Sequence, residues 1–323
     1  MHNGMAVIAI EEHYNDADPA DLIAGGAAGY ASDVLSHLRN LGEGRLRAMD
    51  DAGIDIQVLS LGAPLGAVNH QQLPANQAVE LTRRANDRLA QACAEYPARF
   101  AGFAALPTQV PEQAAQELER CVKGLGFKGA MVHPLTNGVF LDHKQFWPIF
   151  ATAEKLDVPL YLHPAKPHPA VADIYYGEYA HDFPALPGAA LGVTMETATQ
   201  AIRLILGGVF GAYPKLNVIL GHLGEALPFL LWRTNMALSR PGQRSVKFRE
   251  CLCQNFHVTT SGNFSTPALL CTMLELGIDR IMFSVDYPFV ANQDGMDWVK
   301  TLQLSRNDMD KLLGGNAKRL LKL

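Results

Sequence analysis

Four residues with metal-binding side chains stand at the ends of three apolar segments. Glu11 and His13 end the first segment, His163 ends the fifth, and Asp286 ends the eighth. Two imidazoles and two carboxylates suit Zn(II), Mn(II) or Fe(II) without selecting among them. Each residue also has an ordinary interpretation, since a strand-end histidine is commonly structural, Asp286 can begin a turn, and Glu11 can be solvated. Their occurrence together at matching segment ends favours a metal site.

A second pair of polar residues follows the sixth apolar segment. His222 and Glu225 lie three residues apart in Gly-His-Leu-Gly-Glu, near an expected helix start. The carboxylate can orient the imidazole and fix its tautomer, as it does beside catalytic bases. Alternatively, Glu225 is only favourable negative charge in the first turn of a helix. His222 and Glu225, together with Asp286, are the candidate catalytic groups.

Three further residues are candidates for substrate binding. Arg233 carries a planar guanidinium group that can hold a carboxylate, although an ordinary helical arginine is an equally good interpretation. His133 ends the fourth segment and either lines a pocket or caps the strand. Asn263 follows Ser261 at the end of the seventh segment, where a polar pocket wall and a simple turn both fit the sequence.

The elements that position these residues are short apolar segments alternating with helical patterns. The eight strand-like segments are 5–12, 55–61, 100–106, 127–133, 158–163, 217–222, 256–261 and 280–286. The helical patterns include 76–96, 111–124, 143–156, 193–212, 224–239, 266–277 and 307–322. This alternation predicts an α/β fold with a parallel sheet, and eight strands favour a closed (β/α)8 TIM barrel. No Gly-x-Gly-x-x-Gly opens a helix, which argues against a dinucleotide-binding sheet.

A barrel of this kind accommodates the whole chain, 1–323, as a single domain. Two connections are longer than a barrel loop requires, near 14–44 and 164–192. Both leave carboxyl ends of strands, where barrel active sites lie, so we expect them to cover the active site. The second contains Tyr175, Tyr176 and Tyr179, which form either an aromatic wall or lid, packing for the loop, or a subunit contact.

The overall composition narrows the class of protein. The chain is 48% hydrophobic and 18% charged, with a formal net charge of −5, so no basic face for nucleic acid is expected. Its five cysteines are widely spread and indicate a reducing, cytoplasmic setting. We also find no signal peptide and no apolar run of roughly 18–20 residues, so we expect no membrane association.

The chain resembles the branch of the amidohydrolase superfamily that contains the nonoxidative aromatic acid decarboxylases. Members of this branch act on gamma-resorcylate, 2,3-dihydroxybenzoate, 5-carboxyvanillate and aminocarboxymuconate semialdehyde. The matching motifs, in order, are IAIEEH (8–13), RLRAMDDAGIDIQVLS (45–60), ARFAGFAALP (98–107), LGFKGAMVH (125–133), VPLYLHP (158–164), VILGHLGEALPF (218–229), HVTTSGNF (257–264), RIMFSVDYPF (280–289) and GGNAKRLLKL (314–323). HLGEALPFLLWR (222–233) with TTSGNF (259–264) looks most like the hydroxybenzoate decarboxylases.

The resemblance implies one divalent metal ion, Zn or Mn, held by the four residues named first, with His222 beside the open coordination site. Related hydrolases carry a bridging lysine at the end of strand four, where this chain has His133, so a single metal is expected. Ala165-Lys166 follows the strand-five His-Pro, in place of the arginine of the resorcylate enzymes. The 14–44 segment also differs from theirs, so the departures fall where the substrate is expected to bind.

The resemblance also implies an enzyme, a carboxy-lyase that releases CO2 from a hydroxylated aromatic carboxylic acid. Asp286 is the first candidate for protonating the ring carbon, with His222 and Glu225 either tuning it or holding the substrate hydroxyl. Arg233 would steady the anion. Metal-assisted hydrolysis of a lactone or amide is the alternative enzymatic interpretation. A noncatalytic metal-binding barrel is a third. A homodimer or homotetramer is expected by family analogy alone.

Overall fold

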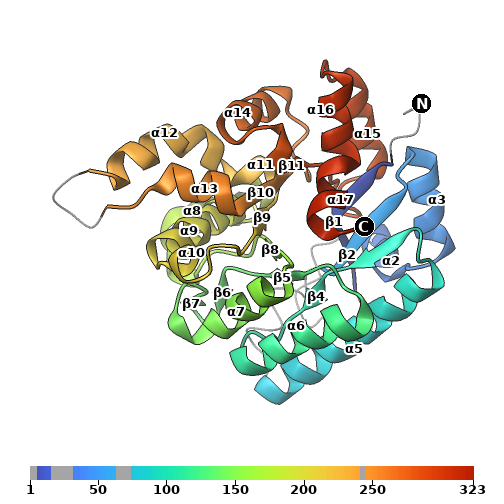
Figure 1. Ribbon diagram of the computed structural model, residues 1–323, viewed down its shortest axis with the longest axis horizontal. Helices are drawn as coiled ribbons and strands as arrows, with labels where there is room; N and C mark the ends of the chain where they lie inside the picture. The colour runs from blue at the N-terminus through green and yellow to red at the C-terminus, as the bar shows by residue number, and fades with distance from the viewer. Residues whose placement is uncertain (1–5, 16–31, 63–73, 241–244) are drawn as a thin grey trace.

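Parallel strands occupy the centre of the molecule, and each is followed by helices that pack outside it, as Figure 1 shows. The computed structural model describes residues 6–15, 32–62, 74–240 and 245–323. Its central strands are β1 (Ile8–Tyr14), β2 (Ile56–Leu61), β3 (Phe100–Gly102), β4 (Ala104–Ala105), β5 (Ala130–Val132), β8 (Leu160–Leu162), β9 (Val218–Leu220), β10 (Phe256–Thr259) and β11 (Ile281–Met282). Since β3 and β4 are two halves of one strand, all eight predicted strands are confirmed.

The strands form one continuous barrel wall in chain order. Backbone pairing runs from β1 through β2 to β3, and from β4 through β5, β8, β9 and β10 to β11. The break at Phe103 is bridged because its amide donates to the Leu59 carbonyl (2.9 Å), while the next amide donates to the Gly129 carbonyl (2.9 Å). The last strand meets the first where the His13 amide donates to the Tyr287 carbonyl (2.7 Å). The fold is therefore the predicted (β/α)8 barrel.

Successive side chains of the strands belong alternately to two apolar clusters, one inside the barrel and one under the helices. Ile8 and Ile10 lie in a cluster inside the barrel, whereas Ala9 belongs to the larger cluster under the helices. The inner cluster also contains Val58, Phe103, Met131, Tyr161, Ile219 and Met282, which come from β2, the β3–β4 strand, β5, β8, β9 and β11. A period of two in a strand buried on both faces produces this division. The interior is thus a packed core rather than a channel.

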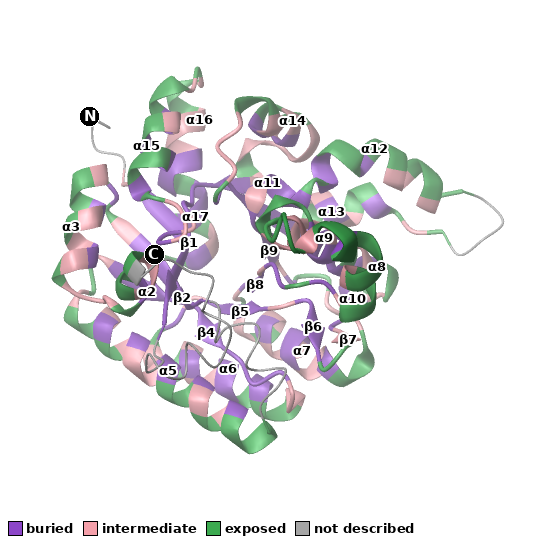
Figure 2. Ribbon diagram, turned by 180° about the vertical axis from the view of Figure 1, so that it is seen from behind, coloured by how far each residue is buried: buried purple, intermediate pink, exposed green. Residues whose placement is uncertain are grey.

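The long helices cover the outer face of the barrel. They include α3 (Glu43–Ala52), α5 (Ala75–Glu95), α6 (Pro111–Leu125), α7 (Trp147–Leu156), α9 (Gly192–Leu206), α12 (Leu227–Leu238) and α14 (Thr266–Leu276). Figure 2 shows buried residues on the inner faces of α5 and α6 and exposed residues on their outer faces. The predicted punctuation of α6 is confirmed, because Pro111 begins it and Gly126 ends it with φ of +73°.

Two predicted helices are interrupted. The predicted 193–212 helix is divided into α9 and α10 (Val209–Ala212), because Gly208 between them has φ of +82°. The predicted 224–239 helix begins as α12 only at Leu227, after the short turn α11 (His222–Glu225). The C-terminal pattern is made of α16 (Arg306–Asp310), η6 (Lys311–Gly315) and α17 (Asn316–Leu321). Among the helices that were not predicted are α3, α13 (Phe248–Asn255) and α15 (Asn292–Thr301).

The expected long insertions contain regular structure. The 164–192 segment is not irregular throughout, since it includes the helix α8 (Pro169–Ala180) and the short turn η4 (Leu186–Ala190). The apolar side chains of α8 are spread around the helix and most of them are exposed, which is why no helical period was visible in the sequence. In the 14–44 segment, Ser32–Arg39 form α2, and 16–31 lie outside the described residues. Across the described ranges, no helix is long and apolar enough to cross a membrane.

The packing inside the barrel generates the first prediction. Phe103 is fully buried, and its ring lies 6.1 Å from the ring of Tyr161. Replacing it with alanine leaves a cavity in the inner cluster, so Phe103→Ala should lower the free energy of unfolding by about 3–5 kcal/mol. Urea denaturation followed by circular dichroism measures this change. Leu274→Ala, at a side chain 84% exposed, is the control and should stay within about 0.5 kcal/mol of the parent. Equal losses for both variants would contradict the assignment of Phe103 to the core.

Candidate active site

Four polar side chains converge at the carboxyl ends of the strands. Glu11 and His13 point to the same side from β1, His163 directly follows β8, and Asp286 follows β11. One nitrogen or oxygen atom from each of the four lies within 4.8 Å of those of the others. We call these residues the four-residue cluster, and the described ranges contain no other such group of potential metal ligands. The structure therefore brings together all four predicted ligands.

The facing atoms of the cluster lack partners of their own. The His13 Nε2 atom lies 3.1 Å from Asp286 Oδ1, and the His163 Nε2 atom lies 3.3 Å from Glu11 Oε1. Glu11 Oε1, His13 Nε2 and Asp286 Oδ1 are buried without a hydrogen bond. Buried polar atoms are rarely left unsatisfied, so several of them facing one another indicate a site for a cation.

Both imidazoles are held in the form that a metal requires. The His163 Nδ1 atom lies 2.8 Å from the Pro164 carbonyl, which can only accept, so Nδ1 carries the proton and Nε2 presents its lone pair. Burial is the main cause that lowers the pKa of His13 to about 4 and that of His163 to about 3. At neutral pH both rings are therefore uncharged and able to coordinate a cation.

Hydroxyl groups hold the other oxygen of Glu11. Its Oε2 atom accepts hydrogen bonds from Tyr161, from Ser261 and, at 3.3 Å, from Thr259. Gly221 makes room for this carboxylate, because a Cβ atom at that position would lie 2.8 Å from Oε2. The hydroxyl donors orient Glu11 so that Oε1 faces the cluster, as partners outside a metal's own ligands commonly do.

Sequence reasoning missed most of these supporting groups. Tyr161 lies two residues before His163, and Thr259 lies two residues before Ser261, so each pair shares one face of its strand. Extending the period of two backwards from the strand ends would have identified them. Only Ser261 had been singled out, as a possible part of a polar wall.

A left-handed turn positions His222 and Glu225 beside the cluster. The φ angles from His222 to Ala226 are +50°, +58°, +86°, +53° and +61°, so α11 winds opposite to an ordinary α-helix. This conformation costs about 1–2 kcal/mol for each residue other than glycine. It brings the His222 Nδ1 atom to 2.8 Å from Glu225 Oε1, and Glu225 is completely buried. Glu225 is therefore not a solvated charge in the first turn of a right-handed helix.

Burial and neighbouring charges shift the pKa values of His222 and Asp286, the two groups that face the open side of the site. Burial lowers the pKa of His222, but the negative charges of Glu225 and Glu11 outweigh it and raise that pKa to about 10. Burial raises the pKa of Asp286 to about 7, against the effect of nearby His222. A cation in the cluster would lower the pKa of Asp286 again through direct attraction. An acid and its electrostatic partner thus stand next to the predicted metal position.

The predicted substrate-binding residues lie at different distances from this centre. The ring of His133 packs 5.3 Å from the ring of His163. The Asn263 side chain donates to the His222 carbonyl (3.2 Å) and so supports the left-handed turn. Arg233 is exposed on α12 and has no hydrogen bond or ion pair with any described residue. The roles of all three in substrate binding stay predictions.

Gly262 borders the open side of the site and had not been singled out from the sequence. It is exposed, has φ of +59°, and lies between His222 and Asp286. A Cβ atom there would be 3.6 Å from the His222 ring and 3.7 Å from Asp286 Oδ2. The absence of a side chain leaves space for another molecule against both groups.

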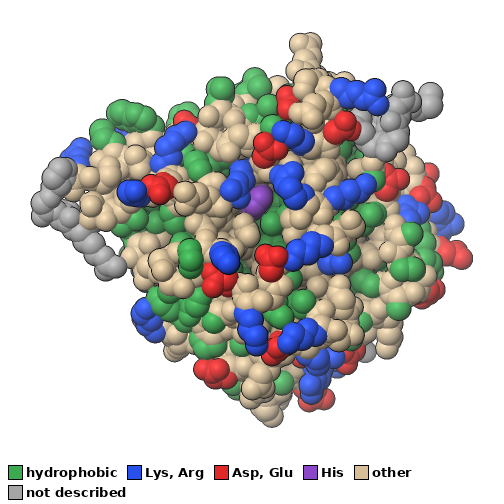
Figure 3. Space-filling model, in the orientation of Figure 1, with side chains coloured by type: hydrophobic (Ala, Val, Ile, Leu, Met, Phe, Trp, Pro, Cys, Tyr) green, Lys and Arg blue, Asp and Glu red, His purple; other side chains and the backbone are tan. Residues whose placement is uncertain are grey.

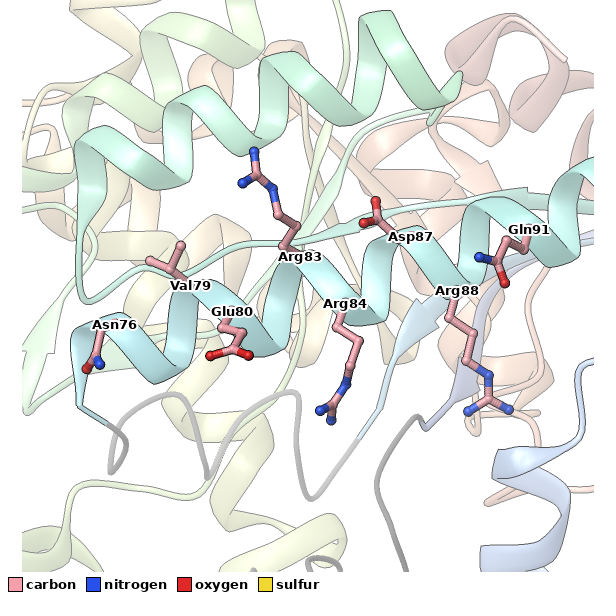
Figure 4. Close-up of a pocket in the computed structure, with 8 residues that line it drawn as sticks. All are labelled: Asn76, Val79, Glu80, Arg83, Arg84, Asp87, Arg88 and Gln91. Atoms are coloured by element: carbon pink, nitrogen blue, oxygen red, sulfur yellow. The ribbon is translucent and has the colours of Figure 1, made fainter.

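A second concave surface lies along α5 (Figure 4). Its lining alternates acidic and basic side chains, including Glu80, Arg83, Arg84 and Asp87. The groove holds no group of three or more potential metal ligands within the described parts of the chain.

The geometry can be compared with that of known proteins. The chain is 42% identical over 329 residues to gamma-resorcylate decarboxylase of Rhizobium radiobacter, with 98% of both chains covered. A solved 2,6-dihydroxybenzoate decarboxylase complexed with 2,6-dihydroxybenzoate superposes with a TM-score of 0.89 at 40% identity, covering 98% of this chain and 99% of that one. The dihydroxybenzoic acid decarboxylase of Polaromonas sp. JS666, solved with manganese and 2-nitroresorcinol, gives 0.89 at 41% identity, covering 99% and 97%.

These similarities extend over nearly the whole chain and are not limited to short motifs. Residues 33–323 match the amidohydrolase family, a span that includes His163, His222 and Asp286. The relatives align over almost their full length as well. With its barrel and its cluster of two histidines and two carboxylates, the chain belongs to the amidohydrolase family.

Proposed function

We propose that this protein is a metal-dependent, nonoxidative decarboxylase of a hydroxylated aromatic carboxylic acid of the hydroxybenzoate type. The four-residue cluster carries most weight, because its unpaired atoms face one another beside an open side bordered by Gly262. Relatives 40–42% identical are named as decarboxylases of gamma-resorcylate and 2,6-dihydroxybenzoate, which supports this substrate class.

The cofactor is one divalent cation, Mn or Zn, held by the four-residue cluster. Two neutral imidazoles and two carboxylates suit either metal. The manganese bound in a solved relative supports Mn as the first choice. At the end of β5 this chain has His133, and no lysine is there to bridge a second metal.

The substrate carboxylate and its neighbouring hydroxyl are placed at the open side of the cluster. When bound, the divalent cation supplies Lewis acidity and a template for these oxygens. Asp286 presents Oδ1 to the cluster and Oδ2 towards Gly262, where a ring carbon can approach. A proton from Asp286 adds to the carbon bearing the carboxylate and breaks aromaticity. Cleavage of the carbon–carboxylate bond then returns its electron pair to the ring and releases CO2.

His222 and Glu225 set the electrostatics of that proton transfer. Because Glu225 and Glu11 hold the pKa of His222 near 10, His222 carries a proton at neutral pH and donates a hydrogen bond to the substrate. Glu225 fixes the ring through Nδ1, which leaves Nε2 for the substrate. His133, Asn263 and Arg233 are the proposed substrate contacts, with Arg233 binding the anion.

The proposal extends to the domain organisation, the oligomeric state and the cellular setting of the enzyme. We propose one domain in which the 14–44 and 164–192 segments cover the active site. Exposed apolar side chains on α8 and α12, including Ile174, Tyr175, Phe229 and Trp232, support a homodimer or homotetramer. All five cysteines are free, which supports a cytoplasmic setting. On the face shown in Figure 3, acidic and basic side chains are interspersed. We propose a small-molecule substrate and no nucleic-acid partner.

The hydrogen bonds that orient Glu11 allow metal binding to be tested without an activity assay. Removing the Tyr161 hydroxyl leaves Thr259 and Ser261 in place but frees Glu11 to rotate. Tyr161→Phe should therefore weaken Mn(II) binding by about 10–100-fold, as measured by isothermal titration calorimetry. Tyr213→Phe removes the hydroxyl of a tyrosine whose ring packs against Trp147 and which is not among the donors to Glu11, so it should leave the affinity unchanged. Equal affinities for the two variants would show that Tyr161 does not orient a ligand.

The reaction is tested by measuring the CO2 that the protein releases from 2,6-dihydroxybenzoate and related ortho-hydroxybenzoates. The manganese-loaded protein should produce CO2, lose this activity on chelation and regain it with Mn(II). No incorporation of 18O from labelled water into the product is expected. Product labelled with 18O and no CO2, from a lactone or amide substrate, would instead establish hydrolysis and refute the proposal.

Removing the proton donor should abolish turnover. Asp286→Asn keeps the side-chain shape but cannot supply the proton, so kcat should fall by at least about 100-fold. Metal content is measured on the same sample by mass spectrometry. Asp142→Asn, at a carboxylate paired with Arg203 (2.9 Å), is the matched control and should retain normal kcat. Substantial activity of metal-loaded Asp286→Asn would refute the role of Asp286.

A further inference from the structure

Glu12 is a buried carboxylate beside the site that has no place in the proposed reaction. It lies between Glu11 and His13 on β1 but points to the opposite side of the strand, away from the four-residue cluster. Its side chain is completely buried. An acidic residue in such a position must be held by several hydrogen-bond donors, and these donors identify what it does.

The donors come from the segment that carries Asp286. Glu12 Oε1 accepts from the Val285 amide (2.9 Å) and from the Ser284 hydroxyl (3.0 Å). Glu12 Oε2 accepts from the Tyr287 amide (3.0 Å). The two oxygens thus bind the amide groups on either side of Asp286.

Asp286 requires such support. Its φ of +78° lies in the left-handed region, which residues other than glycine rarely adopt. Its own carbonyl accepts from the amides of Phe289 (2.9 Å) and Val290 (3.1 Å), which fixes the chain after it. Among these contacts, only those with Glu12 hold the amide groups of Val285 and Tyr287, which stand before and after Asp286.

Glu12 also replaces missing backbone pairing. β1 and β11 share no regular strand ladder, although they close the barrel. In its place, the Ser284 hydroxyl accepts from the Glu11 amide (2.7 Å) and donates to Glu12. Together with the hydrogen bond from the His13 amide to the Tyr287 carbonyl, the side chains of Glu12 and Ser284 therefore connect Glu11 and His13 to the segment of Asp286.

We infer that Glu12 is a positioning residue that sets Asp286 against Glu11 and His13. This inference deepens the proposed function, because Asp286 is both a metal ligand and the proton donor there. A carboxylate is needed for the task, since both of its oxygens accept from donors. A glutamine has a single accepting oxygen, and its amide group would face an N–H donor.

Glu12→Gln is the direct test, and Glu117→Gln is its matched control. Glu117 is also a buried glutamate, but its oxygens accept from Asn86 (2.8 Å) and Arg120 (2.7 Å) between α5 and α6. In the manganese-loaded enzyme, Glu12→Gln should lower kcat by about 10–100-fold while KM changes less than about 3-fold. Glu117→Gln should leave kcat within about 2-fold, whatever its effect on stability.

A second readout needs neither substrate nor metal. Hydrogen–deuterium exchange of peptides spanning 284–287 should become faster in metal-free Glu12→Gln and stay unchanged in Glu117→Gln. Mn(II) affinity, measured by calorimetry, should fall in Glu12→Gln. If the parent protein proves not to be a decarboxylase, these two measurements still support or overturn the role of Glu12.

Ser284→Ala covers the case in which Glu12→Gln does not fold. It removes one donor to Glu12 and should produce smaller changes of the same kind in kcat, exchange and Mn(II) affinity. Unchanged exchange and affinity in whichever of the two variants folds would overturn the inference. An equal loss of kcat in Glu117→Gln would overturn it too, since the effect would then belong to any buried glutamate.

Discussion

The arrangement at the top of the barrel depends on lone pairs that face one another in a buried place. A carboxylate oxygen of Glu11, a ring nitrogen of His13 and a carboxylate oxygen of Asp286 have no partner, and the nearest polar atoms are those of the cluster itself. Such an arrangement is unfavourable in a protein interior unless a positive charge joins it. Fixed strands, neutral imidazoles and the hydroxyl donors around Glu11 all act to hold these atoms in place.

The barrel satisfies this constraint by giving each strand two separate faces. Inward residues such as Phe103 and Tyr161 fill the core, and His163, two residues after Tyr161, reaches the site. Tyr161 belongs to both layers, because its ring packs in the core while its hydroxyl binds Glu11. Tyr161 therefore connects the packing of the core to the site, and a change in core packing around its ring would alter the orientation of Glu11.

Much of this was predictable from the sequence, because the decisive signals were local. Apolar segments with polar ends predicted the eight strands and the four residues that converge in the cluster. The winding of His222–Ala226 was not predictable, since Gly-His-Leu-Gly-Glu looks like the beginning of an ordinary helix. Distant contacts decide it, among them those from Asn263 to the His222 carbonyl and from Thr272 to the Leu223 carbonyl (3.3 Å). The bridge from Glu12 to the Asp286 segment likewise joins residues far apart in the chain.

The left-handed turn also affects how this protein can change. Four of its five residues are not glycine, so the turn costs about 4–8 kcal/mol before its contacts compensate, comparable with the net stability of many domains. Glycine at the exposed Ala226 would relieve part of that cost, but glycine at the buried Leu223 would open a cavity in the core. Selection for heat resistance alone would favour unwinding the turn, whereas selection for catalysis would preserve it. In this segment, the conformation that catalysis requires lowers the thermal stability of the protein.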